Sequence, residues 1–258
     1  MKTLVFTSML TLCGLFLSGA ACAQSGRPVD VALVLAVDAS GSIDSEEYQM
    51  QHQGYAEAFA NPAVIEAIQS GEYRSVAVTL VEWSGFGHQK QMVPWTVIGD
   101  ADSARAFAEQ IRAAPRAYSD WTSISDAIDF CAGLFRSSGV EPLRMVIDVS
   151  GDGVNNNGRP VTAARDDAVA SGVTINGLPI LNEDATLDAY YQENVIGGPG
   201  AFKIPVQDFD TFSQAILGKL VREIATLPAP IKNPDEALLS PHWSPASNFA
   251  VVAERSAS

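Results

Sequence analysis

Apolar and polar positions are grouped along the chain in blocks that predict strands and helices in alternation. Short apolar runs rich in β-branched residues are typical of buried strands, and longer segments with apolar residues three or four apart are typical of helices. The predicted strands are 29–38, 75–84, 88–99, 143–150, 173–181 and 201–206. The predicted helical segments are 45–71, 102–114, 122–139, 159–172, 185–196 and 208–225.

Two prolines refine this pattern. Pro62 lies inside the first helical segment, and because proline removes a backbone donor and clashes with the preceding turn, we expect it to divide 45–71 into two helices. Pro94 lies in the more polar run 88–99, which indicates an edge strand, with antiparallel pairing.

Strands that alternate with helices over about 200 residues predict an α/β fold with a doubly wound, mostly parallel central sheet and helices on both faces. Crossover connections in such folds are right-handed. Ligands collect beyond the carboxyl ends of the strands, where the strand order reverses. Functional residues are therefore expected directly after strands.

The two ends of the chain differ from this pattern. Lys2, an apolar stretch and the small residues Ala21-Cys22-Ala23 predict a secretory signal peptide over 1–23, cleaved near Ala23, and hence a periplasmic or secreted protein. A retained membrane anchor is the alternative, but the apolar run is short for a bilayer. A lipoprotein signal at Cys22 is a weaker one, because Gly19 stands where such signals have leucine.

The remaining boundaries follow from composition. We expect a short linker over 24–28, one domain over 29–227 and a proline-rich tail over 228–258. Removal of the signal would leave Cys131 as the only cysteine, within an apolar segment that predicts a buried structural thiol.

Charge narrows the classes of partner. The chain has 30 Asp and Glu against 16 Lys and Arg, for a formal net charge of −14. Nucleic acids and anionic membranes are bound by concentrated positive charge, so both are disfavoured as partners. The sequence also predicts no membrane insertion of the mature chain. An acidic protein of this kind attracts cations.

Three segments rich in side-chain oxygens stand at the ends of predicted elements. They are Asp38-Ala39-Ser40-Gly41-Ser42 after a strand, Asp120-Trp121-Thr122 before a helix, and Ser150-Gly151-Asp152-Gly153 after a later strand. Hard divalent cations such as Mg²⁺ prefer oxygen ligands and need only one or two carboxylates. No cluster of His and Cys accompanies these segments, which argues against a zinc site.

Asp38-x-Ser40-x-Ser42, a distant Thr122 and the Asp152-Gly153 pair resemble the metal-ion-dependent adhesion site of von Willebrand factor type A domains. The resemblance covers roughly 29–226, and the chain also resembles a bacterial family of exported proteins with this fold and no known function. It implies a Mg²⁺ site, with Mn²⁺ or Ca²⁺ as alternatives. The implied ligands are Asp38, Ser40, Ser42, Thr122 and Asp152. An open position on the metal would take an Asp or Glu carboxylate of a protein or peptide partner.

Some assignments stay open at this level. Family members usually have a hydroxyl residue directly before the last Asp-Gly, whereas Gly151 intervenes here, so Asp148 competes with Asp152 as the last ligand. Strand alternation places Asp148 on a face of the sheet, which favours Asp152. Thr122 could instead cap the helix that follows it. Asp44 or Ser45 is expected to cap the helix predicted from residue 45.

The favoured function is a metal-dependent protein-binding module rather than an enzyme, because no pair of nucleophile and base is evident. A Mg²⁺-dependent phosphohydrolase is one alternative, but such enzymes want a second acid where Ser40 stands. A structural exported domain stabilised by its metal is another. Asn155 and Asn156 are interpreted as a polar turn that could border the site, and Trp121 as the tryptophan best placed at its rim.

Overall fold

The central sheet has five strands in the order β3-β2-β1-β4-β5. In the computed structural model, which describes residues 26–182 and 184–225, every neighbouring pair is parallel except the antiparallel pair β2–β3. The strands are β1 (Arg27–Asp38), β2 (Val76–Trp83), β3 (Gln89–Ile98), β4 (Val140–Gly151) and β5 (Val173–Pro179). The predicted fold class is therefore confirmed, including the antiparallel edge strand.

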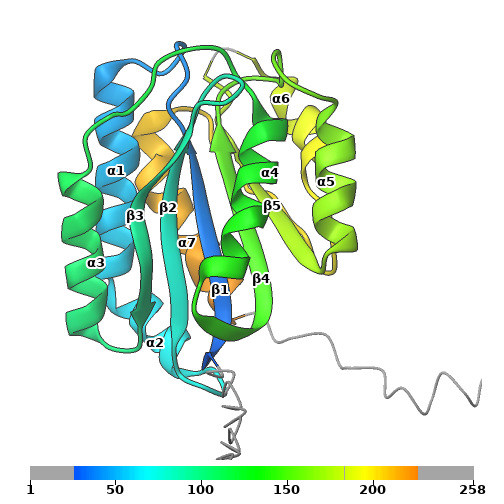
Figure 1. Ribbon diagram of the computed structural model, residues 1–258. Helices are drawn as coiled ribbons and strands as arrows, with labels where there is room; N and C mark the ends of the chain where they lie inside the picture. The colour runs from blue at the N-terminus through cyan, green and yellow to red at the C-terminus, as the bar shows by residue number, and fades with distance from the viewer. Residues whose placement is uncertain (1–25, 183, 226–258) are drawn as a thin grey trace, which may run out of the picture.

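Helices cover both faces of this sheet (Figure 1). The helices α1, α3 and α7 lie on one face, and α4, α5 and α6 lie on the other. The α-helices are α1 (Ser45–Ala60), α2 (Pro62–Gln69), α3 (Ala101–Ala113), α4 (Ile124–Leu134), α5 (Val161–Ala170), α6 (Leu187–Tyr190) and α7 (Phe212–Ala225). Two 3₁₀ turns, η1 (Phe135–Ser137) and η3 (Phe209–Thr211), and a π-helix, η2 (Tyr191–Val195), complete the set.

Alternation along β1 builds two separate hydrophobic cores. Leu33 and Leu35 point into the core shared with α1, α3 and α7, and Val34 and Ala36 point into the core shared with α4 and α5. Every apolar residue of the strand from Val29 to Val37 is fully buried. A strand with apolar residues on both faces can only lie in the middle of a covered sheet, which is where β1 is.

Local signals set the helix boundaries. Asp44 caps α1, accepting hydrogen bonds from the amides of Glu46 and Glu47, while the Glu47 side chain accepts one from the Asp44 amide. Asn61 ends α1 and caps α2, which begins at Pro62. The expected break at Pro62 is therefore confirmed, as is capping by Asp44.

Two predicted elements differ in the structure. The strand predicted at 201–206 is wrong, because the segment makes only isolated parallel bridges, from Lys203 to Gly177 of β5 and from Val206 to Ile180, which follows β5. Pro179 of β5 stands between these points and has no amide hydrogen, whereas the amides on either side of it, of Gly177 and Leu181, donate to the carbonyls of Phe202 and Val206. The helix predicted at 185–196 divides into the short α6 and the π-helix η2.

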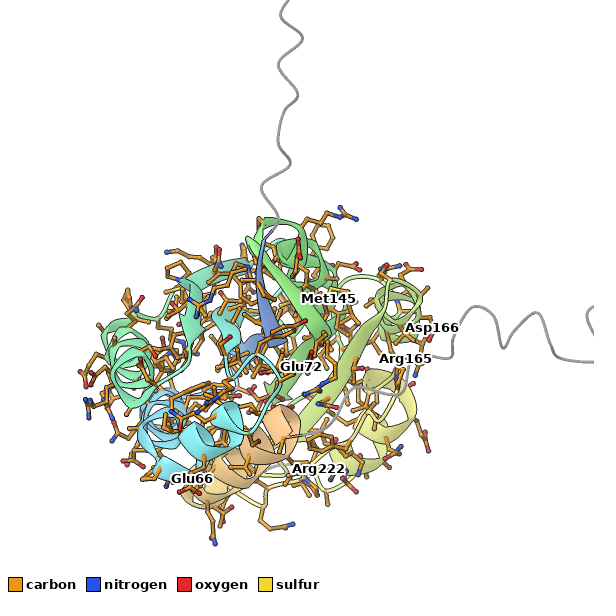
Figure 2. The ribbon with its side chains drawn as sticks, turned by 90° about the horizontal axis from the view of Figure 1, so that it is seen from below. Glu66, Glu72, Met145, Arg165, Asp166 and Arg222 are labelled. Atoms are coloured by element: carbon orange, nitrogen blue, oxygen red, sulfur yellow. The ribbon has the colours of Figure 1, made fainter. Side chains whose placement is uncertain are left out.

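The described residues cover nearly all of the domain predicted at 29–227 and part of the predicted linker. The strand β1 begins at Arg27, so it includes the last two residues of the segment expected to be a linker. The signal peptide predicted at 1–23 and the tail predicted at 228–258 lie outside the described residues. Within the described part, no helix is long and apolar enough to span a bilayer. Figure 2 views the end of the molecule opposite the metal-site candidates, where Glu66, Glu72 and Arg222 lie.

Candidate metal centre

The three oxygen-rich segments meet at one edge of the sheet. Strands β1 and β4 are neighbours at its centre, and the chain leaves them toward opposite edges, so the strand order reverses between them. Both strands end at the same edge, β1 at Asp38 and β4 at Gly151 (Figure 1). The segment Asp120-Trp121-Thr122 is joined to the first by the Gly41 amide, which donates to the Asp120 carbonyl at 2.7 Å.

Four of the five predicted ligands are linked by direct hydrogen bonds. The Ser42 hydroxyl donates to Oδ1 of Asp152 at 2.7 Å, across 110 residues of sequence. The hydroxyl oxygens of Ser40 and Ser42 lie 3.2 Å apart, and the Ser40 amide donates to Oδ1 of Asp38 at 2.7 Å. The structure therefore brings Asp38, Ser40, Ser42 and Asp152 into one cluster.

Thr122 stands beside this cluster, and it does not cap α4. The N-cap is Ser123, whose hydroxyl accepts from the Asp126 amide, so the capping alternative for Thr122 is wrong. The Thr122 hydroxyl lies 3.6 Å from the position that a Cβ at Gly153 would take. Its side chain is thus adjacent to the segment that carries Asp152.

Asp148 occupies a different place. Its carboxylate is fully buried between the sheet and α7, where it forms an ion pair with Lys219, which is also paired with Glu223. Its side chain points from a face of the sheet, as strand alternation predicted. Of the two aspartates that competed as the last ligand, Asp152 is the one hydrogen-bonded to Ser42.

Gly151 accounts for the departure from the usual hydroxyl-Asp-Gly pattern. A Cβ at this position would lie 2.7 Å from Oδ2 of Asp38 and 3.1 Å from the Tyr191 hydroxyl. Neither group can withdraw easily, because Asp38 and Tyr191 are both fully buried. The close approach of β4 to the Asp38 carboxylate therefore requires glycine.

The electrostatics of the cluster fit a hard divalent cation. Burial and the neighbouring carboxylate of Asp152 raise the pKa of Asp38 to about 8. Its Oδ2 is buried and accepts no hydrogen bond from the described residues. Two carboxylates and three hydroxyl groups match the oxygen preference of Mg²⁺ or Mn²⁺, and a cation would relieve the repulsion between the carboxylates. No group of three His, Cys, Asp or Glu side chains suited to a metal occurs within 26–182 and 184–225.

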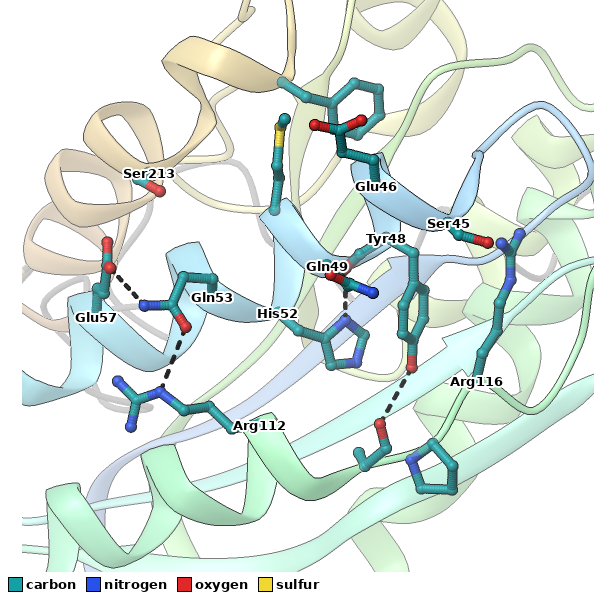
Figure 3. Close-up of a pocket in the computed structure, with 14 residues that line it drawn as sticks. Ser45, Glu46, Tyr48, Gln49, His52, Gln53, Glu57, Arg112, Arg116 and Ser213 are labelled. Carbon is teal, nitrogen blue, oxygen red and sulfur yellow. Dashed lines mark hydrogen bonds between the residues drawn. The ribbon is translucent and has the colours of Figure 1, made fainter.

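Arg116 holds the first segment in place from the side. Its Nη2 donates to the carbonyls of Ala39, Ser40 and Ile43 at 3.0, 2.9 and 2.8 Å, and its Nε donates to the Tyr118 carbonyl at 2.9 Å. Figure 3 shows Arg116 beside Tyr48 at one end of a cavity of about 1040 Å³ along α1. Sequence analysis did not single out this arginine, which lies in a coil segment without a motif.

Three consecutive asparagines connect the loops around the cluster. The side-chain oxygens of Asn155, Asn156 and Asn157 accept from the amides of Ser125, Thr122 and Phe86 at 3.0, 3.0 and 2.6 Å. The sequence predicted that Asn155 and Asn156 form a polar turn that could border the site. In the structure each asparagine satisfies a backbone donor of a different position, so the loops are fixed relative to one another.

Comparison with known proteins identifies a family for this chain. Residues 28–228 match the family described as protein of unknown function (DUF1194). The chain belongs to this family. A search of curated proteins found no match.

Solved structures share the fold at low sequence identity. Proximal thread matrix protein 1 from the mussel byssus has a TM-score of 0.60 and 16% identity, over 78% of this chain and 49% of that one. The pilus adhesin SpaC from Lactobacillus rhamnosus GG has a TM-score of 0.56 and 16% identity, over 78% and 31%. A von Willebrand factor type A protein from Catenulispora acidiphila has a TM-score of 0.53 and 15% identity, over 76% and 43%.

The fold of this family member is thus that of von Willebrand factor type A domains. The matched part spans half or less of each of these relatives. Another structure of the mussel protein, with a TM-score of 0.56 and 15% identity over 78% and 49%, is described as having a zinc-occupied MIDAS motif, MIDAS being the abbreviation for the metal-ion-dependent adhesion site.

Proposed function

We propose that this member of the DUF1194 family is a metal-dependent protein-binding module. Asp38, Ser40, Ser42, Thr122 and Asp152 hold the cation, which we take to be Mg²⁺, with Mn²⁺ or Ca²⁺ as alternatives. The bound metal receives an Asp or Glu carboxylate of a protein or peptide partner. Residues 1–23 direct the chain to the periplasm or the exterior.

The observation that supports this most is the hydrogen-bonded cluster itself. Side chains from two segments 110 residues apart meet in it, and one of them is a buried carboxylate without a donor for Oδ2. Leaving a buried carboxylate oxygen unpaired is unfavourable, so a cation is the natural partner for Asp38. The relatives described as an adhesin and as having a zinc-occupied MIDAS motif support a binding role for such a site.

The charge around the cluster supports a metal-mediated contact with a carboxylate. A cavity of about 620 Å³ opens beside Ser42, Thr122 and Asp152, and it is also lined by Asp120 and Asp184. A partner carboxylate would be repelled by these acidic groups in the absence of metal. With a divalent cation bound, the favourable contact is confined to the metal.

Catalysis has less support. None of the described residues that line this cavity is a lysine or a histidine. A phosphohydrolase with an aspartate nucleophile needs a general acid or base and a positive group for the phosphate, in addition to its metal. The side chain two residues after Asp38 is the buried Ser40 rather than a carboxylic acid.

Isothermal titration calorimetry with Mg²⁺, Mn²⁺, Ca²⁺ and Zn²⁺ tests the metal site. We expect saturable binding of Mg²⁺ or Mn²⁺ by the wild-type protein and its loss in Asp38→Asn, which keeps the shape of the buried side chain. Asp102→Ala is the matched control, because Asp102 is an exposed carboxylate on α3 that pairs with Arg105.

Two outcomes of this titration contradict the proposal. One is the absence of Mg²⁺ and Mn²⁺ binding by the wild-type protein. The other is equal affinity in the wild-type protein and Asp38→Asn. Thermal melting of each variant with and without metal shows whether a lost signal reflects the site or a failure to fold, since a ligand that binds the native state raises the melting temperature.

A further inference from the structure

Exposed apolar side chains are concentrated around the candidate metal site. Five large apolar side chains of the described residues are exposed, and the two most exposed are Phe86 at 67% and Trp121 at 64%. Both lie on loops at the carboxyl ends of the parallel strands, as does Val154 at 39%. The remaining two, Tyr73 and Leu143, lie before β2 and near the start of β4, away from the site.

Two of these side chains line the cavity beside the site, and the loop of the third lies next to them. Trp121 and Val154 line the cavity of about 620 Å³ together with Ser42, Thr122 and Asp152. The loop that carries Phe86 packs against Trp121, because a Cβ at Gly85 would lie 3.4 Å from the Trp121 Cβ.

Hydrogen bonds hold the three loops in position. The Phe86 amide donates to Asn157 at 2.6 Å, and the Thr122 amide donates to Asn156 at 3.0 Å. Asn156 and Asn157 follow Val154 closely in sequence, so the backbones that present all three apolar side chains are tied together. Binding to a surface ordered in advance costs less conformational entropy.

A tryptophan held in solvent beside a concave polar site is a typical anchor of a binding surface. Aromatic side chains are enriched at the centre of protein interfaces, and Trp is prominent among the residues whose truncation costs the most affinity. Exposed apolar groups that lie together, rather than singly, indicate an interaction surface. The acidic groups of the cavity, Asp120 and Asp184, would add no attraction for an acidic partner away from the metal.

We propose that Phe86, Trp121 and Val154 form an apolar rim that binds an aromatic or aliphatic side chain next to the metal-bound carboxylate of the partner. This inference rests on the proposed function. The recognised element is then a protein segment in which Asp or Glu adjoins a large apolar residue. The metal attracts the carboxylate, and the apolar rim determines which acidic segments bind.

A peptide array tests the apolar rim directly. The full chain is incubated with Mg²⁺ on immobilised hexapeptides that carry a central Glu or Gln, with Phe, Leu, Ala or Ser beside it. We expect capture of the Glu peptides flanked by Phe or Leu, with loss of capture in EDTA or when Gln replaces Glu. Trp121→Ala and Phe86→Ala should each weaken this capture by about tenfold or more, as truncation of an interface anchor does.

Matched measurements separate the apolar rim from the metal site. Calorimetry should give the same Mg²⁺ affinity for Trp121→Ala, Phe86→Ala and the wild-type protein, because neither side chain is among the proposed ligands. Tyr73→Ala is the control for loss of an exposed aromatic ring elsewhere, and we expect it to leave peptide capture unchanged.

The contrary outcomes are distinguishable. Metal-dependent capture of Glu peptides regardless of their neighbours, unchanged in Trp121→Ala, overturns the apolar rim and leaves the proposed function standing. Capture of apolar peptides that survives EDTA overturns the link between apolar rim and metal. Binding of Mg²⁺ without capture of any peptide overturns both the partner class and the apolar rim. Self-association abolished by Trp121→Ala, seen by sedimentation velocity, would assign the surface to a second copy of this chain.

Discussion

Replacement of Arg116 by alanine should loosen the first segment of the metal site. One guanidinium nitrogen donates to the carbonyls of Ala39, Ser40 and Ile43, all within 3.0 Å. A hydrogen bond to a charged group contributes about 1.5–3 kcal/mol. The three bonds share one nitrogen, and water can reach the carbonyls once the partly buried side chain is gone. We therefore expect a net loss of about 1–2 kcal/mol, far below the sum.

This loss has two measurable consequences. In the metal-free protein, the amides of Gly41 and Ile43, which are hydrogen-bonded to Asp120 and Ser40, should exchange with deuterium about five- to thirtyfold faster, as expected for 1–2 kcal/mol. In calorimetry, Mg²⁺ affinity should fall by less than about twofold, because a loop that still opens only part of the time leaves most molecules competent to bind the metal.

Arg112→Ala is the matched control. Arg112 borders the same cavity along α1, but its guanidinium contacts Gln53 and Glu109 and does not reach the loop (Figure 3). Arg116→Lys should give an intermediate result, since an ammonium group cannot reproduce the planar fork that also reaches Tyr118. Exchange rates of Gly41 and Ile43 that stay the same in Arg116→Ala would refute this reasoning, whatever the metal affinity.

Three further changes test the buried polar groups. Lys219→Met leaves two buried carboxylates without their cation and should lower the free energy of unfolding by about 3–5 kcal/mol in urea titrations; a loss below 1 kcal/mol would contradict this. Burial and a neighbouring glutamate raise the pKa of Asp148 to about 7, although Lys219 opposes this. The folded state then holds a proton that the unfolded state lacks, so stability should fall as pH rises from about 4 to 7, and less steeply in Asp148→Asn; equal slopes would count against the assignment. Tyr191→Phe removes a buried hydroxyl that makes no hydrogen bond with the described residues, so Mg²⁺ affinity should stay close to that of the wild-type protein, as in Tyr73→Phe; a loss of about tenfold would show that the hydroxyl supports Asp38.

Sequence alone determined the fold class and the composition of the candidate site. The continuous apolar run of β1 requires burial on both faces, so the strand had to lie at the centre of a covered sheet. Local chemistry also set the cap at Asp44 and the break at Pro62. The Asp38-x-Ser40-x-Ser42 spacing marked the first segment because three oxygen-bearing side chains after a buried strand exceed what a turn requires.

The structure of 201–206 and the role of Gly151 depend on contacts between distant segments, which sequence patterns do not reveal. The segment 201–206 has the apolar character of a strand, but pairing depends on the neighbouring edge, where Pro179 lacks an amide hydrogen. The role of Gly151 followed only from its distance to Asp38 and Tyr191, which belong to other segments of the chain.

Tertiary structure alone decided how the site is held together. Arg116 contacts carbonyls that any residue could offer, and the three asparagines at 155–157 accept from backbone amides of two distant loops and of the first turn of α4. Such bonds are made to the main chain, so they leave no complementary residue type in the sequence to reveal them. The sequence determined which side chains could bind a cation, and the folded backbone decided that Ser42 and Asp152 meet, because both adjoin neighbouring parallel strands that end at one edge.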